Sequence, residues 1–100
     1  MKHYTITYHH TTCKGTLFNM FNSVSESKKD CLEVFKTDLM KLLTMHTVDD
    51  ERIEYCLNGD IRIMNSKNEV YEIYHAFNVW EQRTHDRQPI YKHNKWYYTL

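Results

Sequence analysis

Histidine and cysteine side chains near the start of the 100-residue chain have the most obvious chemical potential: His9, His10 and Cys13. Imidazole and thiolate both suit zinc, and this spacing would let two of the three reach one ion. A structural zinc site needs four ligands, however, and the sequence offers no CxxC pair and no second histidine pair to complete it. We therefore interpret these residues as polar positions of a turn and predict no metal and no cofactor.

Cys31 is the best nucleophile candidate, because it lies near the start of a predicted helix beside Lys28 and Lys29, which would lower its thiol pKa. It also adjoins an apolar stripe, and cysteine is among the most frequently buried residue types, so we predict burial instead. Three cysteines cannot all pair within one chain, and their spacing lacks the dense pattern of small secreted proteins. Reduced thiols and an N-terminus without a continuous apolar run predict a cytoplasmic protein with no membrane partner.

An acidic cluster follows the predicted helix. Carboxylates on an open surface keep ordinary pKa values and gain little catalytic advantage, so a solvated cap is the favoured interpretation. The cluster can still accept a basic partner. The candidate binding residues are Asp49, Asp50 and Glu51, with Glu54 nearby.

The C-terminal segment interleaves basic and aromatic residues. Lysine and arginine contact phosphates while aromatic rings stack on unpaired bases, a combination typical of single-strand nucleic-acid binding. The same residue types also anchor protein interfaces. The candidate binding residues here are Arg83, Arg87, Tyr91, Lys92, Lys95, Trp96 and Tyr98.

The composition narrows the range of functions that the protein can have. Thirteen basic and thirteen acidic residues cancel, which argues against an acidic nucleic-acid mimic and against a non-specific DNA binder. Two glycines leave little room for Gly-rich phosphate loops. No residues form a recognisable catalytic set, so we predict a small non-enzymatic protein-binding module, a stand-alone inhibitor or adaptor of the kind that phages and other mobile elements use against host defence. The alternatives are a single-stranded nucleic-acid-binding module acting through the C-terminal segment, and a small nuclease using His85 or His93.

The apolar pattern predicts the elements that position these residues. Residues 3–9 alternate with Tyr4, Ile6 and Tyr8 on one face, and after a polar turn over 10–15 a second strand can return over 16–21. A helix is predicted from an N-cap near Ser27 to His46. Its inward stripe is expected to comprise Leu32, Phe35, Leu39, Leu42 and His46, flanked by Cys31 and Leu43, with Lys29, Glu33, Lys36, Lys41 and Thr44 facing outward.

A hairpin is predicted after the helix. A two-residue Asn58-Gly59 turn would mix apolar and charged residues on both faces. A loop of 57–59, with Gly59 in the left-handed conformation of a bulge, gives one apolar face instead. The predicted pairs are Tyr55 with Ile61, Ile53 with Ile63, and Glu54 with Arg62.

Segment 69–81 decides the topology. Tyr71, Ile73, Phe77 and Val79 alternate as in a strand, whereas Ser66 to Glu69 resembles a helix capping box. We favour the strand, because the segment is rich in β-branched and aromatic residues. The prediction is a single α+β domain over 1–100, with a mostly antiparallel ββαβββ sheet plus a C-terminal strand packed by one long helix near 27–46. A helical 69–81 would give a ferredoxin-like βαββαβ order, and an edge strand offers a route to homo-oligomers.

Overall fold

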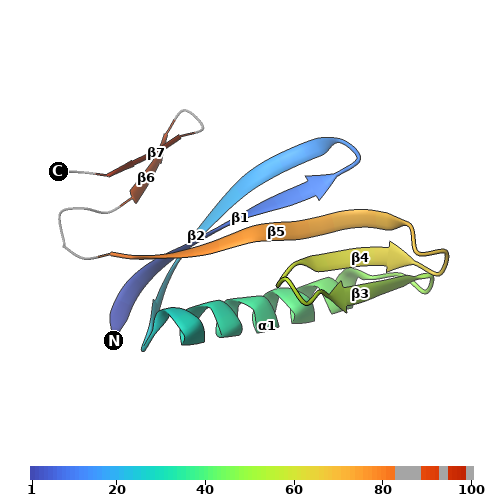
Figure 1. Cartoon of the computed structure of the whole chain (residues 1–100), viewed down its shortest axis with the longest axis horizontal. Coiled ribbons are helices and arrows are strands. Elements are labelled where there is room, and N and C mark those ends of the chain that lie inside the picture. Colours follow the sequence, from blue (N-terminus) through green and yellow to red (C-terminus); the bar gives the residue numbers. More distant parts are fainter. Residues whose placement is uncertain (83–88, 93–94, 99–100) are drawn as a thin grey trace.

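An antiparallel five-stranded sheet and one long helix form the body of the protein (Figure 1). The computed structural model describes the backbone of residues 1–82, 89–92 and 95–98, and the side chains of residues 1–82. The sheet order is β2-β1-β5-β4-β3, which confirms the α+β class and the ββαβββ order. The elements are β1 (Lys2–Thr12), β2 (Gly15–Ser25), α1 (Lys28–His46), β3 (Glu51–Tyr55), β4 (Ile61–Asn65) and β5 (Val70–Glu81). In the C-terminal segment β6 (Pro89–Lys92) and β7 (Lys95–Tyr98) pair as a sheet of their own.

β5 joins the two hairpins of the sheet, which explains why segment 69–81 is a strand. It pairs antiparallel with β1 on one side and with β4 on the other, so its backbone N–H and C=O groups find partners in both neighbouring strands. The expected capping box is a turn instead: the Asn65 side-chain oxygen accepts the backbone N–H groups of Lys67 and Glu69, each at 2.9 Å. Asn68 takes a positive φ of 64° within this turn, a conformation that asparagine tolerates.

A bulge in β5 changes which residues face the helix. The pairing with β1 shifts between Thr7 and His9, and Ala76 adopts a φ of 56° at this point. An extra residue reverses the alternation of a strand. Buried Tyr74 therefore joins Phe77 beneath the helix, which corrects the prediction that Ile73 shares the face of Phe77.

The helix begins and ends where predicted, but its buried face is rotated. The Ser27 side chain accepts the Asp30 backbone N–H at 3.1 Å, as an N-cap should. Leu42 and His46, predicted to face inward, are exposed, whereas Lys36, predicted to face outward, is buried. The reason is that the helix packs through a row spaced by four residues, a common ridge in helix packing. This row comprises Cys31, Phe35, Leu39 and Leu43.

The core lies between α1 and one face of the sheet. One buried group contains Leu43, Ile61, Ile63 and Tyr74, and a second contains Tyr4, Ile6 and Cys31. The Tyr8 ring connects them, with centroids 5.4 Å from Phe35 and 5.5 Å from Phe77. None of the helices in the described part of the chain is long and apolar enough to span a bilayer.

Candidate functional site

The structure separates the residues first considered as metal ligands. His9 and His10 point to opposite faces of β1: His9 lies against Phe18 and His75, whereas His10 stacks on Tyr74 with ring centroids 4.2 Å apart. Cys13 lies exposed in the turn that follows. Residues 1–82 contain no group of three or more His, Cys, Asp or Glu side chains that could hold a metal ion.

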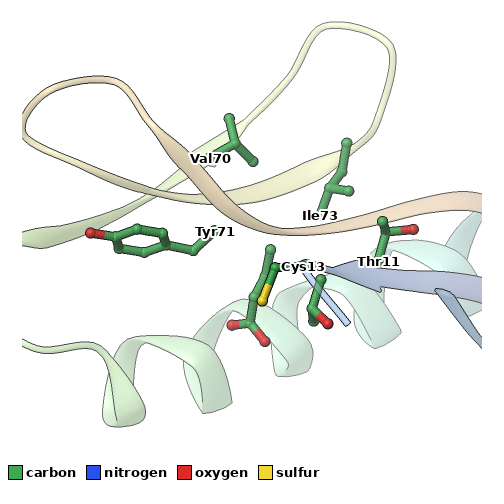
Figure 2. Close-up of a pocket in the computed structure, with 7 residues that line it drawn as sticks. Thr11, Cys13, Val70, Tyr71 and Ile73 are labelled. Atoms are coloured by element: carbon green, nitrogen blue, oxygen red, sulfur yellow. The ribbon is translucent and has the colours of Figure 1, made fainter. Parts of the chain in front are cut away.

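Cys13 lines an open cleft of about 420 Å³ at the end of β1 (Figure 2). A thiol needs a neighbouring base or cation to react readily as a nucleophile. The carboxylate in the lining, that of Glu72, lies 3.0 Å from His10 Nε2 and is engaged there, and the Tyr71 hydroxyl accepts a hydrogen bond from Asn65. The cleft therefore offers an exposed thiol without an activating partner in its lining, which comprises Thr11, Thr12, Cys13, Val70, Tyr71, Glu72 and Ile73.

Cys31 is buried in the core, which confirms the sequence interpretation. Burial raises the pKa of its thiol, and a hydrogen bond with Ser23 offsets part of that effect. A thiol whose pKa is raised in this way is less nucleophilic at neutral pH, because less of it is thiolate.

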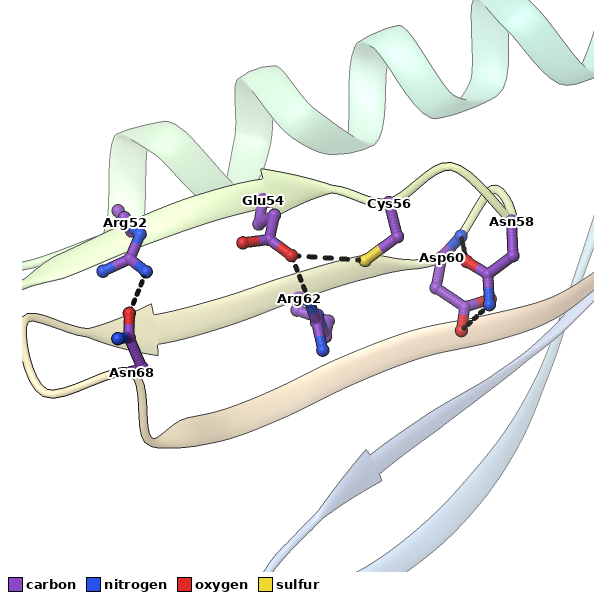
Figure 3. A network of polar contacts seen from close by, with 7 residues as sticks. All are labelled: Arg52, Glu54, Cys56, Asn58, Asp60, Arg62 and Asn68. Carbon is purple, nitrogen blue, oxygen red and sulfur yellow. Dashed lines mark hydrogen bonds and ion pairs between the residues drawn. The ribbon is translucent and has the colours of Figure 1, made fainter.

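The β3–β4 hairpin has the predicted register and is reinforced by polar contacts (Figure 3). Arg62 donates to the Glu54 carboxylate, and the Cys56 thiol donates to the same oxygen at 3.7 Å. The bond to Arg62 lowers the pKa of Glu54, and the same bond raises the pKa of Arg62. Gly59 has a φ of 93°, the left-handed conformation predicted for the loop. These contacts stabilise the hairpin, and the Glu54 carboxylate is engaged by Arg62 and Cys56.

Lys36 holds the tip of this hairpin from the helix. Its Nζ donates to the Gly59 carbonyl oxygen at 2.7 Å and lies 4.4 Å from the centroid of the Phe77 ring. Only 8% of the residue is exposed. A lysine can reach such a position by burying its stem and bringing its charge to a carbonyl and a ring face. This contact differs from the outward position predicted for Lys36, because a lysine between apolar helical positions is ordinarily a surface residue.

The acidic residues after α1 have different environments. Glu51 accepts the Val48 backbone N–H at 3.1 Å, so its carboxylate caps the loop. Asp49 and Asp50 are exposed in the turn before β3.

Exposed apolar side chains precede these two aspartates. Leu42, Met45 and Val48 are 52%, 77% and 66% exposed. Residues three apart on a helix are neighbours, so Leu42 and Met45 adjoin each other and Val48 follows just beyond the helix end. We call Leu42, Met45, Val48, Asp49 and Asp50 the α1 end patch. Sequence reasoning selected its two aspartates but placed Leu42 in the core, and the spacing of Leu42, Met45 and Val48 was the signal that could have revealed it.

The C-terminal binding candidates are only partly placed. Arg83 and Arg87 lie outside the described residues. In β6 and β7, Tyr91 pairs with Trp96, Lys92 with Lys95, and Pro89 with Tyr98. Their role in binding stays a prediction.

Comparison with protein-family models, with curated proteins and with solved structures gives no match.

Proposed function

We propose that this protein is a small non-enzymatic protein-binding module that uses the α1 end patch to cover a surface of its partner. The observation that supports this most strongly is the exposure of Leu42, Met45 and Val48 beside two exposed aspartates. Apolar patches bordered by polar residues mark interaction sites in soluble proteins. A module of this kind would act as an inhibitor or adaptor by occupying its partner.

The chemistry of the patch indicates the kind of partner surface it fits. The apolar part of the patch would fit a complementary apolar depression on the partner, and methionine adapts its shape to such surfaces. This part comprises Leu42, Met45 and Val48. Asp49 and Asp50 call for lysine or arginine at the rim of that depression, because complementary charges steer association and set orientation.

The patch has enough uncovered apolar surface to matter. Complete burial of a leucine, methionine or valine side chain is worth about 1.5–3 kcal/mol. Because roughly half to three quarters of each of these residues is exposed, covering them supplies about 3–6 kcal/mol before the costs of association. A few such side chains near the centre of an interface commonly carry most of the binding energy.

The titratable side chains considered in the sheet and in α1 support a binding role over a catalytic one. His10 is engaged with Tyr74 and Glu72, and His75 Nε2 lies 2.8 Å from Thr11 Oγ1. Glu54 is engaged by Arg62, and Cys31 is buried. Each of these side chains is already packed or hydrogen-bonded within the protein, which favours a structural role for it.

The test is a tagged capture from the source cell with the variant Leu42→Glu/Met45→Glu beside Val34→Glu. Val34 is a matched control, because it is 59% exposed on the same helix about 12 Å before Leu42. We expect the double variant to weaken capture on the order of 100-fold and the control to capture as the wild type does. Equal capture by the double variant and the wild type would remove the basis of the proposal.

A further inference from the structure

β2 is an edge of the sheet with an unusual composition. It runs for eleven residues, Gly15–Ser25, and no charged residue occurs in it. The other edge, β3, is five residues long and carries Glu51, Arg52 and Glu54. Charged residues and short length are the usual protections of an edge strand against pairing with another chain, and β2 has neither.

Alternate residues of β2 direct their backbone groups away from β1. The turn at Cys13 and Lys14 is closed by the pair Thr12–Gly15, which is a hydrogen-bonded pair because only two residues separate its members. Hydrogen-bonded pairs then alternate along the hairpin, so even-numbered residues such as Met20, Asn22 and Val24 direct their N–H and C=O groups away from β1. No strand of the described chain pairs with this side of β2.

We propose that β2 pairs antiparallel with β2 of a second copy of this chain, about a two-fold axis at Met20. Met20 is the middle residue of β2, so this register pairs the strand along its whole length. The two five-stranded sheets then form one continuous sheet of ten strands. It also brings cover to the half-exposed side chains of Leu17, Phe21 and Val24.

Charge at the two ends of β2 favours a second copy as the occupant. Lys14 precedes the strand by one residue and Glu26 follows it by one, and both are exposed. In an antiparallel pair centred on Met20, Lys14 of one copy lies opposite Glu26 of the other. The two-fold axis repeats this pair at the far end, so opposite charges meet at both ends of an otherwise uncharged interface.

Analytical ultracentrifugation over a concentration series tests the proposal through a charge swap. We expect the wild type to reach twice its 12.2 kDa mass. Lys14→Glu and Glu26→Lys should each raise the dimer Kd roughly tenfold, because each places two pairs of like charges in contact. The combined variant Lys14→Glu/Glu26→Lys restores opposite charges and should return the Kd to within about threefold of wild type.

A second variant tests the backbone contribution. Met20→Pro removes an outward N–H and leaves the β1–β2 ladder intact, so it should be monomeric with an unchanged circular dichroism spectrum. Leu42→Glu/Met45→Glu should remain a dimer, because the α1 end patch lies outside this interface. A wild type that stays monomeric, or single swaps that leave the Kd unchanged, would overturn the dimer without affecting the proposed partner-binding patch.

Discussion

Ala76 is the residue at which a single substitution should make the protein more stable. It has a φ of 56° at the bulge in β5 and is exposed. A left-handed conformation costs a residue with a Cβ about 1–2 kcal/mol, a cost that glycine does not carry. Glycine in turn loses about 0.5–1 kcal/mol more backbone entropy on folding. Ala76→Gly should therefore raise the free energy of unfolding by about 0.5–1 kcal/mol, or the Tm by about 2–8 °C.

Two further variants make this prediction specific. Ala76→Val places a β-branched residue in the same conformation and should lower the free energy of unfolding by more than about 1 kcal/mol. Asn78→Gly is the comparison on the same strand, because Asn78 is exposed and has no positive φ; it should be destabilising, since it costs backbone entropy and also removes the side-chain hydrogen bond to the Ala76 carbonyl oxygen. Urea denaturation of the three variants measures these differences. An Ala76→Gly protein no more stable than the wild type would refute the reasoning.

The β3–β4 hairpin and the cysteine thiols can be tested in the same way. Gly59→Ala should lower the free energy of unfolding by at least about 1–2 kcal/mol, because the added Cβ would lie 2.9 Å from Lys36 Nζ at a positive φ; wild-type stability in urea would contradict this. Since Arg62 lowers the pKa of Glu54, the ion pair stabilises the fold above the unfolded-state pKa of about 4.3 and loses that effect as the pH falls toward the lowered value. The wild type should therefore lose more stability than Glu54→Gln between about pH 5 and 3, and parallel thermal-denaturation profiles would be inconsistent with it. In the folded protein, iodoacetamide should alkylate exposed Cys13 first and buried Cys31 last, as read by peptide mass spectrometry, whereas equal rates would show that Cys31 is accessible.

Much of the fold could be predicted from sequence because local patterns agreed with long-range packing. In the β3–β4 hairpin, a loop ending in Gly59 aligned apolar Ile53 with Ile63 and Glu54 with Arg62, so one register satisfied both faces. The choice of strand for 69–81 followed from β-branched and aromatic content, and pairing on both sides of β5 explains it.

Other features depend on geometry that the sequence does not reveal. A bulge is often marked by glycine, but here alanine takes the left-handed conformation. The sequence therefore gives no sign that Tyr74, and not Ile73, packs beneath the helix. The helix face was misassigned because its inward row follows a spacing of four, which buries Lys36 and exposes Leu42.

The candidate site was predictable in part. Exposed aspartates after a helix could be read from sequence, and Asp49 and Asp50 are exposed. The apolar half of the α1 end patch depends on which side of α1 faces the sheet, and that follows only from packing. The aromatic and basic residues of the C-terminal hairpin remain a sequence prediction for binding.

The most direct test of the central claim is a quantitative capture from the source cell, with and without nuclease treatment, by the wild type and by Leu42→Glu/Met45→Glu. A protein-binding module should retain a stoichiometric protein partner after nuclease treatment, and the double variant should lose it. Loss of every partner from the wild type on nuclease treatment would contradict the proposal and favour single-stranded nucleic acid bound by the C-terminal segment.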